Sequence, residues 1–444
     1  MTTEILVIGG GLAGAEAAWQ AAAGGPVTLS EMRPATMTPA HHSGDLAELV
    51  CSNSLRAEDP DTPAGLLKAE MKAMGSLVLA CAERVRLPAG KALAVDREAF
   101  ATLVTRAVTA HPRIRLVREE VRELPEEGVT VVATGPLTSP SLAGSLAGFA
   151  GEAHLYFYDA ASPIVTGESI DRERTFRGSR YGRGGEEDYL NCPLDQDEYE
   201  VFWRALVGAE QYPRKEFEET VFFEGCLPVE EQARRGRDTL RFGPLRPVGL
   251  RDPVTGREPY AVVQLRQDNL AATLYGLVGF QTNLRSGEQE RVFRLIPALR
   301  EARLVRYGVM HRNTYLNSPR LLKPSLEARK RPGLFFAGQL TGVEGYLESA
   351  ATGMVAGINA RRRAAGTDPL ILPGQTMAGS LCHYVAGADP SRFQPMNANF
   401  GLLPTLAGHS RQRRRERMVT RSLEALGEYL LSRNFQPPSP CLPS

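Results

Sequence analysis

Three glycines near the start of the chain have the spacing of a site that binds a pyrophosphate. Gly9, Gly11 and Gly14 follow the apolar run Ile5-Leu6-Val7-Ile8 and precede an alanine-rich segment. In dinucleotide-binding units the first glycine makes the turn and the second lets the backbone approach the pyrophosphate, while the third lets the helix pack on the strand. The helix N-terminus then faces the phosphates. The motif therefore predicts a strand, a glycine turn and a helix that bind a dinucleotide.

An acidic residue follows at the distance that such a site requires. Glu31 ends a second apolar run, Val27 to Ser30, and lies 17 residues after Gly14. A carboxylate in this place can accept hydrogen bonds from ribose hydroxyls. S-adenosylmethionine methyltransferases use a similar glycine-rich turn followed by an acid, so the ligand class stays open at this point.

Two later segments favour FAD. Residues 129–135 read as a strand ending in Ala133-Thr134-Gly135, and residues 333–339 as a strand ending in Ala337-Gly338-Gln339. Both are similar to flavoprotein signatures. A small-residue helix over 345–360, starting at Gly345, would direct its N-terminus at the same place. Many flavoproteins carry an acid where Gln339 stands, and the alternative is that this segment is only a buried strand and helix.

The separation of these segments predicts an α/β fold with a discontinuous, Rossmann-like FAD-binding domain. We expect this domain to comprise residues 1–170 and 325–444, with a helical C-terminal part, and an α+β insertion or substrate domain over 171–324. The insertion contains no second glycine motif. Any nicotinamide nucleotide is therefore expected to bind transiently.

Composition limits the functional classes. The 444 residues are 43% hydrophobic with a net charge of +1, and no apolar run approaches the length of a membrane span. We expect a protein of the cytoplasm without an export signal. Cysteines 51, 81, 192, 226, 382 and 441 include no C-x-x-C pair, so no metal site is expected.

A basic run lies near the C-terminal end. Residues 411–417 contain five arginines, in a predicted helix over 413–431. Such a run is either a solvated helix face or a patch that contacts phosphates. The sequence leaves both interpretations open.

The chain resembles the folate- and FAD-dependent tRNA (uracil-5-)-methyltransferases, the TrmFO family, which are relatives of the GidA flavoproteins. The glycine turn is shared with other flavoproteins, whereas the two segments that contain Cys51 and Cys226 are more specific to this family. The resemblance rests on five stretches in family order: the start through Glu31-Met32-Arg33-Pro34, Cys51-Ser52-Asn53-Ser54-Leu55-Arg56, and residues 223–230, 306–314 and 336–346.

The resemblance implies methylation of the T-loop uridine of tRNA at C5, which forms ribothymidine. Methylenetetrahydrofolate would donate the carbon and FADH2 the hydride, with NAD(P)H reducing the flavin. The implied partners are the tRNA T-arm, folate and NAD(P)H, with no membrane and no obligate protein partner.

The resemblance also implies residue roles. Cys226 would add to uracil C6, and Cys51 would take the C5 proton or hold the one-carbon unit, although the two roles remain interchangeable. Arg33 and Tyr346 would contact the cofactor, and His311, Tyr346 and Arg56 the substrate. Nearby cations lower the pKa of a reactive thiol, and Arg56 and Arg234 or Arg235 are candidates. Cysteines 81, 192, 382 and 441 are expected to be inert.

Three other classes remain. A wobble-uridine-modifying flavoprotein of the GidA type would be longer and carry an additional helical domain. A generic NAD(P)H-flavin oxidoreductase or amine oxidase would act on a small molecule without reactive cysteines. A flavin-bearing RNA-binding protein would bind tRNA without turnover.

Overall fold

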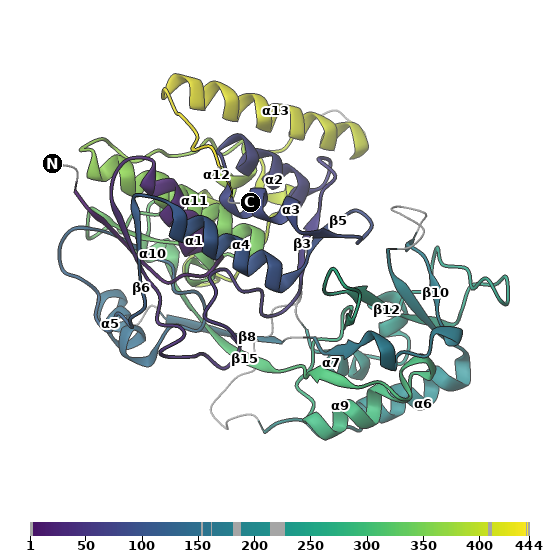
Figure 1. Cartoon of the computed structure of the whole chain (residues 1–444). Helices are drawn as coiled ribbons and strands as arrows, with labels where there is room; N and C mark the ends of the chain where they lie inside the picture. Colours follow the sequence, from purple (N-terminus) through teal and green to yellow (C-terminus); the bar gives the residue numbers. More distant parts are fainter. Residues whose placement is uncertain are drawn as a thin grey trace.

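A parallel sheet forms the centre of the larger part of the molecule (Figure 1). The computed structural model describes residues 3–151, 154–160, 162–180, 188–213, 227–406, 411–440 and 442. The five strands of this sheet are all parallel to their neighbours. Their order is β16 (Leu334–Phe336), β7 (Val129–Val132), β1 (Ile5–Ile8), β2 (Val27–Ser30) and β6 (Ile114–Val117). Short apolar strands of this kind are typical of a sheet covered on both faces. The predicted α/β class is confirmed.

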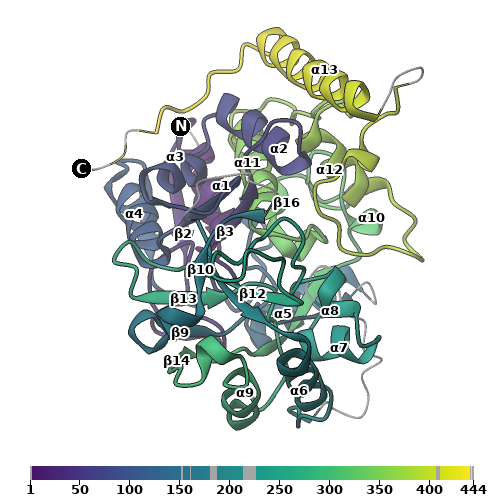
Figure 2. The ribbon, with the colours of Figure 1, turned by 90° about the vertical axis from the view of Figure 1, so that its right-hand side faces the viewer.

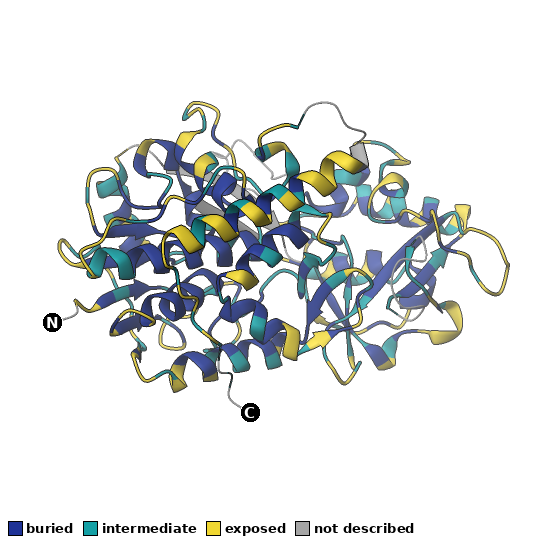
Figure 3. Ribbon diagram, turned by 90° about the horizontal axis from the view of Figure 1, so that it is seen from above, coloured by how far each residue is buried: buried dark blue, intermediate teal, exposed yellow. Residues whose placement is uncertain are grey.

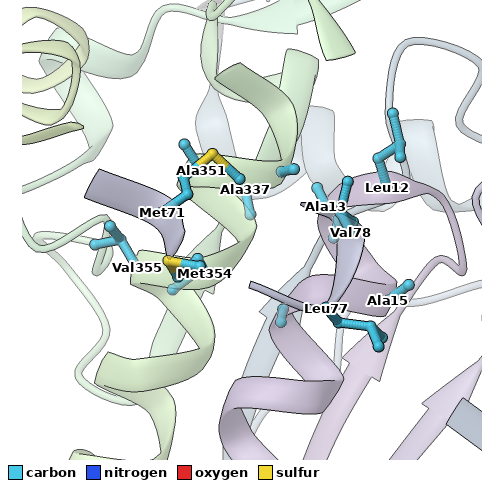
Figure 4. Packing of buried hydrophobic residues seen from close by; sticks show 14 of the residues in the cluster. Leu12, Ala13, Ala15, Met71, Leu77, Val78, Ala337, Ala351, Met354 and Val355 are labelled. Carbon is cyan, nitrogen blue, oxygen red and sulfur yellow. The ribbon is translucent and has the colours of Figure 1, made fainter. Parts of the chain in front are cut away.

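Helices α1 (Leu12–Ala22) and α11 (Tyr346–Ala364) pack closely, and this contact explains the small residues of α11. A Cβ atom added to Gly353 would lie 2.2 Å from the carbonyl oxygen of Ala13, and one added to Gly357 would lie 2.3 Å from that of Ala17. Figure 4 shows small and apolar side chains of both helices, including Ala13 and Ala351, in the same core. The two helices run in the same direction, and α11 begins about two turns before the point where Gly353 meets the start of α1.

A helical layer covers this core and is tied together by buried carboxylates. It contains α2 (Pro63–Ala73), α3 (Leu77–Arg84), α4 (Arg97–Ala110), α12 (Met377–Gly387) and α13 (Arg411–Ser432). The carboxylate of Glu70 accepts hydrogen bonds from the first N–H groups of α12, at Met377 and Ala378, and from the hydroxyl of Ser422 on α13. A carboxylate in this place satisfies the free N–H groups of a helix end. Figure 3 shows the exposed outer face of α13.

The smaller part of the molecule is built on an antiparallel sheet of six strands. Their order is β10 (Phe176–Arg177), β11 (Leu190–Leu194), β12 (Ala261–Gln267), β13 (Leu274–Leu277), β9 (Ile164–Thr166) and β14 (Leu304–Arg306). Helices α6 (Gln196–Val207), α7 (Val229–Arg234), α8 (Thr239–Phe242) and α9 (Ser286–Phe293) accompany it (Figure 2). Its strands come from residues 164–306. The domain boundaries at 170 and 324 remain predictions.

Shorter elements connect the two parts. An antiparallel ribbon pairs β8 (His154–Ala160) with β15 (Met310–Leu316), so the chain enters and leaves the smaller part side by side (Figure 1). A three-stranded sheet has the order β3 (Ser54–Ala57), β5 (Ala92–Val95) and β4 (Arg86–Leu87). Helices α5 (Pro140–Ala150) and α10 (Ser318–Leu321) complete the larger part.

Two features that bear on function are absent from the described residues. These residues contain no helix with the length and apolar character needed to cross a bilayer. They also contain no group of three or more His, Cys, Asp or Glu side chains arranged to hold a metal ion.

The buried carboxyl of Glu70 predicts a pH dependence of stability. Burial raises its pKa to about 7 from 4.5, against the hydrogen bonds from Ala378, Ser422 and Met377. The folded state thus retains a proton that the unfolded state releases, so this contribution is complete below pH 4.5 and is lost as the pH rises through about 7. Glu70→Gln should flatten the pH dependence of the unfolding free energy by on the order of 3 kcal/mol.

Urea unfolding between pH 5 and 8 measures this effect, with the exposed Glu424→Gln as the control. Parallel pH profiles for the wild type and Glu70→Gln would contradict the prediction.

Candidate functional site

A cleft opens beyond the carboxyl ends of the parallel strands. Its volume is about 1000 Å³, including the solvent-filled mouth. Four strand ends supply most of its wall: residues 8–13 after β1, 30–33 after β2, 133–139 after β7, and 338–339 after β16. Ligands of parallel α/β sheets bind at this edge, and the volume is sufficient for a cofactor. The predicted residues Gly9, Gly11, Ala133, Gly135 and Gly338 all line this cleft.

The three glycines of the turn meet different structural requirements. Gly9 has a φ of +99°, and its N–H donates to the carbonyl of Ser30 at 2.8 Å. A Cβ added to Gly14 would lie only 1.7 Å from the carbonyl oxygen of Gly9, so helix and turn touch there. A Cβ added to Gly11 would meet no atom within 4 Å. The space next to Gly11 is therefore open to a ligand in the cleft. This space lies beside the N-terminus of α1, which no side chain caps.

The acid at the end of β2 is held by local partners. Glu31 accepts hydrogen bonds from the N–H of Gly10 at 2.6 Å and from the backbone N–H and the Nε of Arg33, both at 2.9 Å. Burial would raise the pKa of Glu31, but the charge and hydrogen bonds of Arg33, together with Gly10, hold it below its usual value. Arg33 is buried and also reaches Glu48 at 3.3 Å. Both Glu31 and Arg33 line the cleft.

The segment after β16 also contributes a polar pair. Gln339 lines the cleft, and its Nε2 donates to the carboxylate of Glu344 at 2.8 Å. The acid that many flavoproteins carry at the position of Gln339 is thus replaced by an amide in contact with a nearby buried acid. Gly345, with a φ of +117°, forms the N-cap of α11. A side chain there would collide with Glu348.

Tyr346, the first residue of α11, connects the cleft to the segment that contains Cys51. The hydroxyl of Tyr346 accepts hydrogen bonds from the backbone N–H groups of Cys51 at 2.6 Å and Ser52 at 3.1 Å. Burial raises the pKa of this hydroxyl, the charge of Cys51 raises it further, and Arg97 opposes both effects. Because Tyr346 also lines the cleft, the backbone of Cys51 lies beside the cleft wall.

Contacts from both parts of the molecule hold residues 49–53, which we call the Cys51 loop. Arg97 donates to the carbonyls of Leu49 at 2.7 Å and Cys51 at 3.3 Å, and its Nε lies 2.9 Å from both carboxylate oxygens of Asp268. Arg266 donates to the hydroxyl of Ser52 at 2.7 Å. The amide of Asn53 donates to the carbonyl of Gln267 at 3.0 Å.

Comparison with known proteins places this site in a family. A family model described as "Glucose inhibited division protein A" matches residues 4–368. A Moorella thermoacetica protein named methylenetetrahydrofolate–tRNA-(uracil-5-)-methyltransferase TrmFO is 62% identical over 427 residues, which cover 96% of this chain and 98% of that protein. The chain belongs to the TrmFO family. A TrmFO protein from Desulforudis audaxviator is 58% identical, covering 97% of this chain and 99% of its own.

The solved structure of GidA from Aquifex aeolicus shares the fold of this TrmFO family member. Its TM-score is 0.69 at 18% identity, and the match covers 96% of this chain and 73% of that chain. At this identity the likeness shows the fold alone.

Two residues predicted from the TrmFO resemblance cannot be placed in the cleft. Cys226 lies outside the described residues. His311 belongs to β15, where its backbone is paired with Asp159 of β8. Their predicted roles remain predictions.

Two arginines that were not predicted contact the Cys51 loop, and the roles expected of Arg56 and of Arg234 or Arg235 near the reactive thiols remain predictions. Arg56 forms an ion pair with the buried Glu348 at 3.1 Å, and Arg234 pairs with Glu231 at 2.7 Å. Arg97 and Arg266 contact the loop directly. Neither contact could be predicted, because nothing in a helix start or a strand indicates which distant loop a long side chain will reach.

The remaining described cysteines agree with the expectation of inert thiols. Cys81, Cys192 and Cys382 are buried. Burial raises the pKa of Cys81 and of Cys382 to about 12, and it also raises that of Cys192. Cys441 lies outside the described residues.

The surroundings of Gly11 and Gly14 predict that alanine at the first position weakens FAD binding and that alanine at the second destabilises the fold. Gly11→Ala should fold normally, because its φ of −71° suits any residue and its Cβ meets no protein atom, but FAD affinity should fall about tenfold or more. Gly14→Ala should destabilise the fold by on the order of 3 kcal/mol, because the turn must move. Thermal melting and FAD titration measure the two effects. Equal FAD affinity in Gly11→Ala and the wild type would refute the assignment.

Proposed function

We propose that this protein methylates C5 of the T-loop uridine of tRNA, with methylenetetrahydrofolate as the carbon donor and FADH2 as the reductant. NAD(P)H reduces the flavin, and the reaction takes place in the cytoplasm. The observation that carries the proposal is the attachment of the Cys51 loop to Tyr346, a residue of the cleft wall. This contact supports the proposal because it holds a thiol-bearing loop beside the cleft that we propose to bind FAD, as methyl transfer to uracil requires.

The cleft suits FAD in its shape and polarity. The open space above Gly11 and the free N–H groups at the start of α1 suit a pyrophosphate. Glu31 lies at the end of β2, where a ribose would be recognised. Gly338, Gln339 and the N-terminus of α11 would border the ring system, where the positive helix end favours electron-rich atoms. When bound, reduced flavin supplies the hydride that converts a methylene to a methyl group.

The chain itself must activate the uracil. C5 of uracil becomes nucleophilic only after a thiolate adds at C6, and a base must then remove the C5 proton. We assign Cys226 to the addition at C6 and Cys51 to the proton or the one-carbon unit. The hydrogen bonds from Cys51 and Ser52 to Tyr346 orient the loop, and the contacts of Arg97 limit its movement. His311, Tyr346 and Arg56 are proposed contacts of the base or the folate.

The tRNA requires a cationic surface, because flipping the target base out of the T-loop costs a few kcal/mol that backbone contacts must offset. Helix α13 confirms the predicted helix, and its residues 413–417 are exposed. Four of these five residues are arginines. We propose that this face of α13 contacts tRNA phosphates.

Two other candidate functions receive less support. A wobble-uridine function of the GidA type would rest on a likeness in fold at 18% identity, whereas two relatives at 58% and 62% identity carry the TrmFO name. A generic oxidoreductase would not require the contacts that hold the Cys51 loop at the cleft.

A component-omission assay tests the proposed reaction. The purified protein, unmodified tRNA, methylenetetrahydrofolate, FAD and NAD(P)H should form ribothymidine, measured by mass spectrometry of digested tRNA. Omission of folate should abolish the product. Product formed with S-adenosylmethionine in its place, or no product with the full mixture and a folded, FAD-loaded protein, would overturn the proposal.

The two cysteines can be separated with tRNA that contains 5-fluorouracil, which traps the thiolate added at C6. Cys226→Ala should lose the covalent complex that the wild type forms, detected as a shifted band in denaturing gels. Cys382→Ala, at a buried thiol, is the matched control. A complex that persists in Cys226→Ala would assign the addition to another residue.

A further inference from the structure

Two guanidinium groups contact the Cys51 loop at the junction of the two parts, and a third lies close to their side chains. Arg97 begins α4 and binds the carbonyls of Leu49 and Cys51. Arg266 lies near the end of β12 and binds the hydroxyl of Ser52. Arg306 ends β14, and its electrostatic neighbours include Arg97 and Tyr346. Two of these three cations therefore come from the smaller part, whereas the loop belongs to the larger part.

The carboxylates nearby are already engaged. Asp268 is bound by Arg97 through both of its oxygens. Glu48 accepts hydrogen bonds from the N–H of His42, from the N–H and hydroxyl of Ser43, and from Arg33. Among the described residues, the titratable and charged groups around the loop include the Arg56–Glu348 ion pair further along the chain and Arg97, Arg266, Asp268, Arg306, Glu48, Arg33, Tyr189 and Tyr346.

Two of the guanidinium groups have donors without acceptors. The Nε of Arg266 and the Nη1 of Arg306 are buried, and neither has a hydrogen-bond partner in the described residues. Burial lowers the pKa of Arg266, while Tyr189, Asp268 and Cys51 oppose that shift. A buried cationic donor without an acceptor is costly, so such a site favours a nearby anion. Because these atoms are inaccessible to solvent, the anion is expected to be a group of the protein.

We propose that Arg266, assisted by Arg306, stabilises the thiolate form of Cys51 and is a positioning residue for its reaction. The step is a proton transfer: the thiol proton leaves to solvent, and the sulfur keeps the bonding electron pair. Docking of the smaller part on the Cys51 loop then creates the reactive thiol, because β12 delivers the cation. The inference rests on the proposed participation of Cys51 in methyl transfer.

Alkylation of Cys51 with iodoacetamide tests this inference in the full-length, FAD-loaded protein. Peptide mass mapping between pH 5.5 and 9 follows Cys51 separately from the other thiols. Since only the thiolate reacts, Arg266→Gln should slow alkylation at pH 7 about tenfold and move the pH profile upward by about one unit. Arg266→Lys, which retains the charge, should restore most of the rate. A purely structural role for Arg266 would leave the midpoint of the profile unchanged.

Controls make the result decisive. Arg303→Gln removes an exposed arginine three residues before Arg306 and should leave the profile unchanged. Cys81 and Cys382 are buried thiols that should stay unreactive in every folded variant. Should Arg266→Gln fail to fold, Arg306→Gln, which leaves the Ser52 contact in place, should shift the profile in the same direction. A wild-type profile in a folded Arg266→Gln or Arg306→Gln variant would overturn the inference.

The alkylation assay contains neither tRNA nor folate. A protein that forms no ribothymidine but shows the arginine-dependent shift would refute the proposed function and leave the inference about the thiol standing. A protein that forms ribothymidine but shows no arginine-dependent shift would refute the inference about the thiol and leave the proposed function standing.

Discussion

The guanidinium of Arg97 connects three segments around the candidate site. It begins α4, binds two carbonyls of the Cys51 loop, and forms a buried ion pair with Asp268 of the smaller part. Residues 49–53 form no helix or strand, so tertiary contacts alone determine where the loop lies. Removal of one partner of a buried ion pair typically costs about 3–5 kcal/mol, because the other charge is left unpaired. The position of Cys51 therefore depends on the contact between the two parts.

The two parts have separate tasks in this arrangement. The parallel sheet and α1 form the dinucleotide cleft, and α11 supplies Tyr346 at its edge. The antiparallel sheet supplies Arg266, which contacts Ser52 of the loop, and the residue after β12, Asp268, binds Arg97. The Cys51 loop therefore lies between the cleft of the larger part and a cation of the smaller part.

Features that depend on local backbone geometry could be predicted from the sequence. The strand, turn and helix around Gly9 and Gly14 were predictable because a side chain at either position would collide with neighbouring backbone. The small residues of α11 were informative for the same reason, since Gly353 touches Ala13. These constraints act through short distances and leave a pattern in residue type.

Contacts between distant segments could not be predicted in this way. Arg97 and Asp268 are 171 residues apart, and neither differs by type from a surface residue. The hydrogen bond from Arg33 to Glu31 could not be predicted either, because the glycine motif indicates only the contact between the acid and a ribose. The roles of Cys51 and Cys226 came from the family resemblance, and no spacing in the chain indicates that the two thiols meet.

The central claim is that one cleft holds FAD with its ring system beside the Cys51 loop. A crystal structure of the FAD-loaded protein tests this claim most directly. We expect the pyrophosphate at Gly11 and the start of α1, and the isoalloxazine next to Tyr346 with the sulfur of Cys51 facing it. An isoalloxazine that lies away from Tyr346, with Cys51 separated from it by other side chains, would contradict the account.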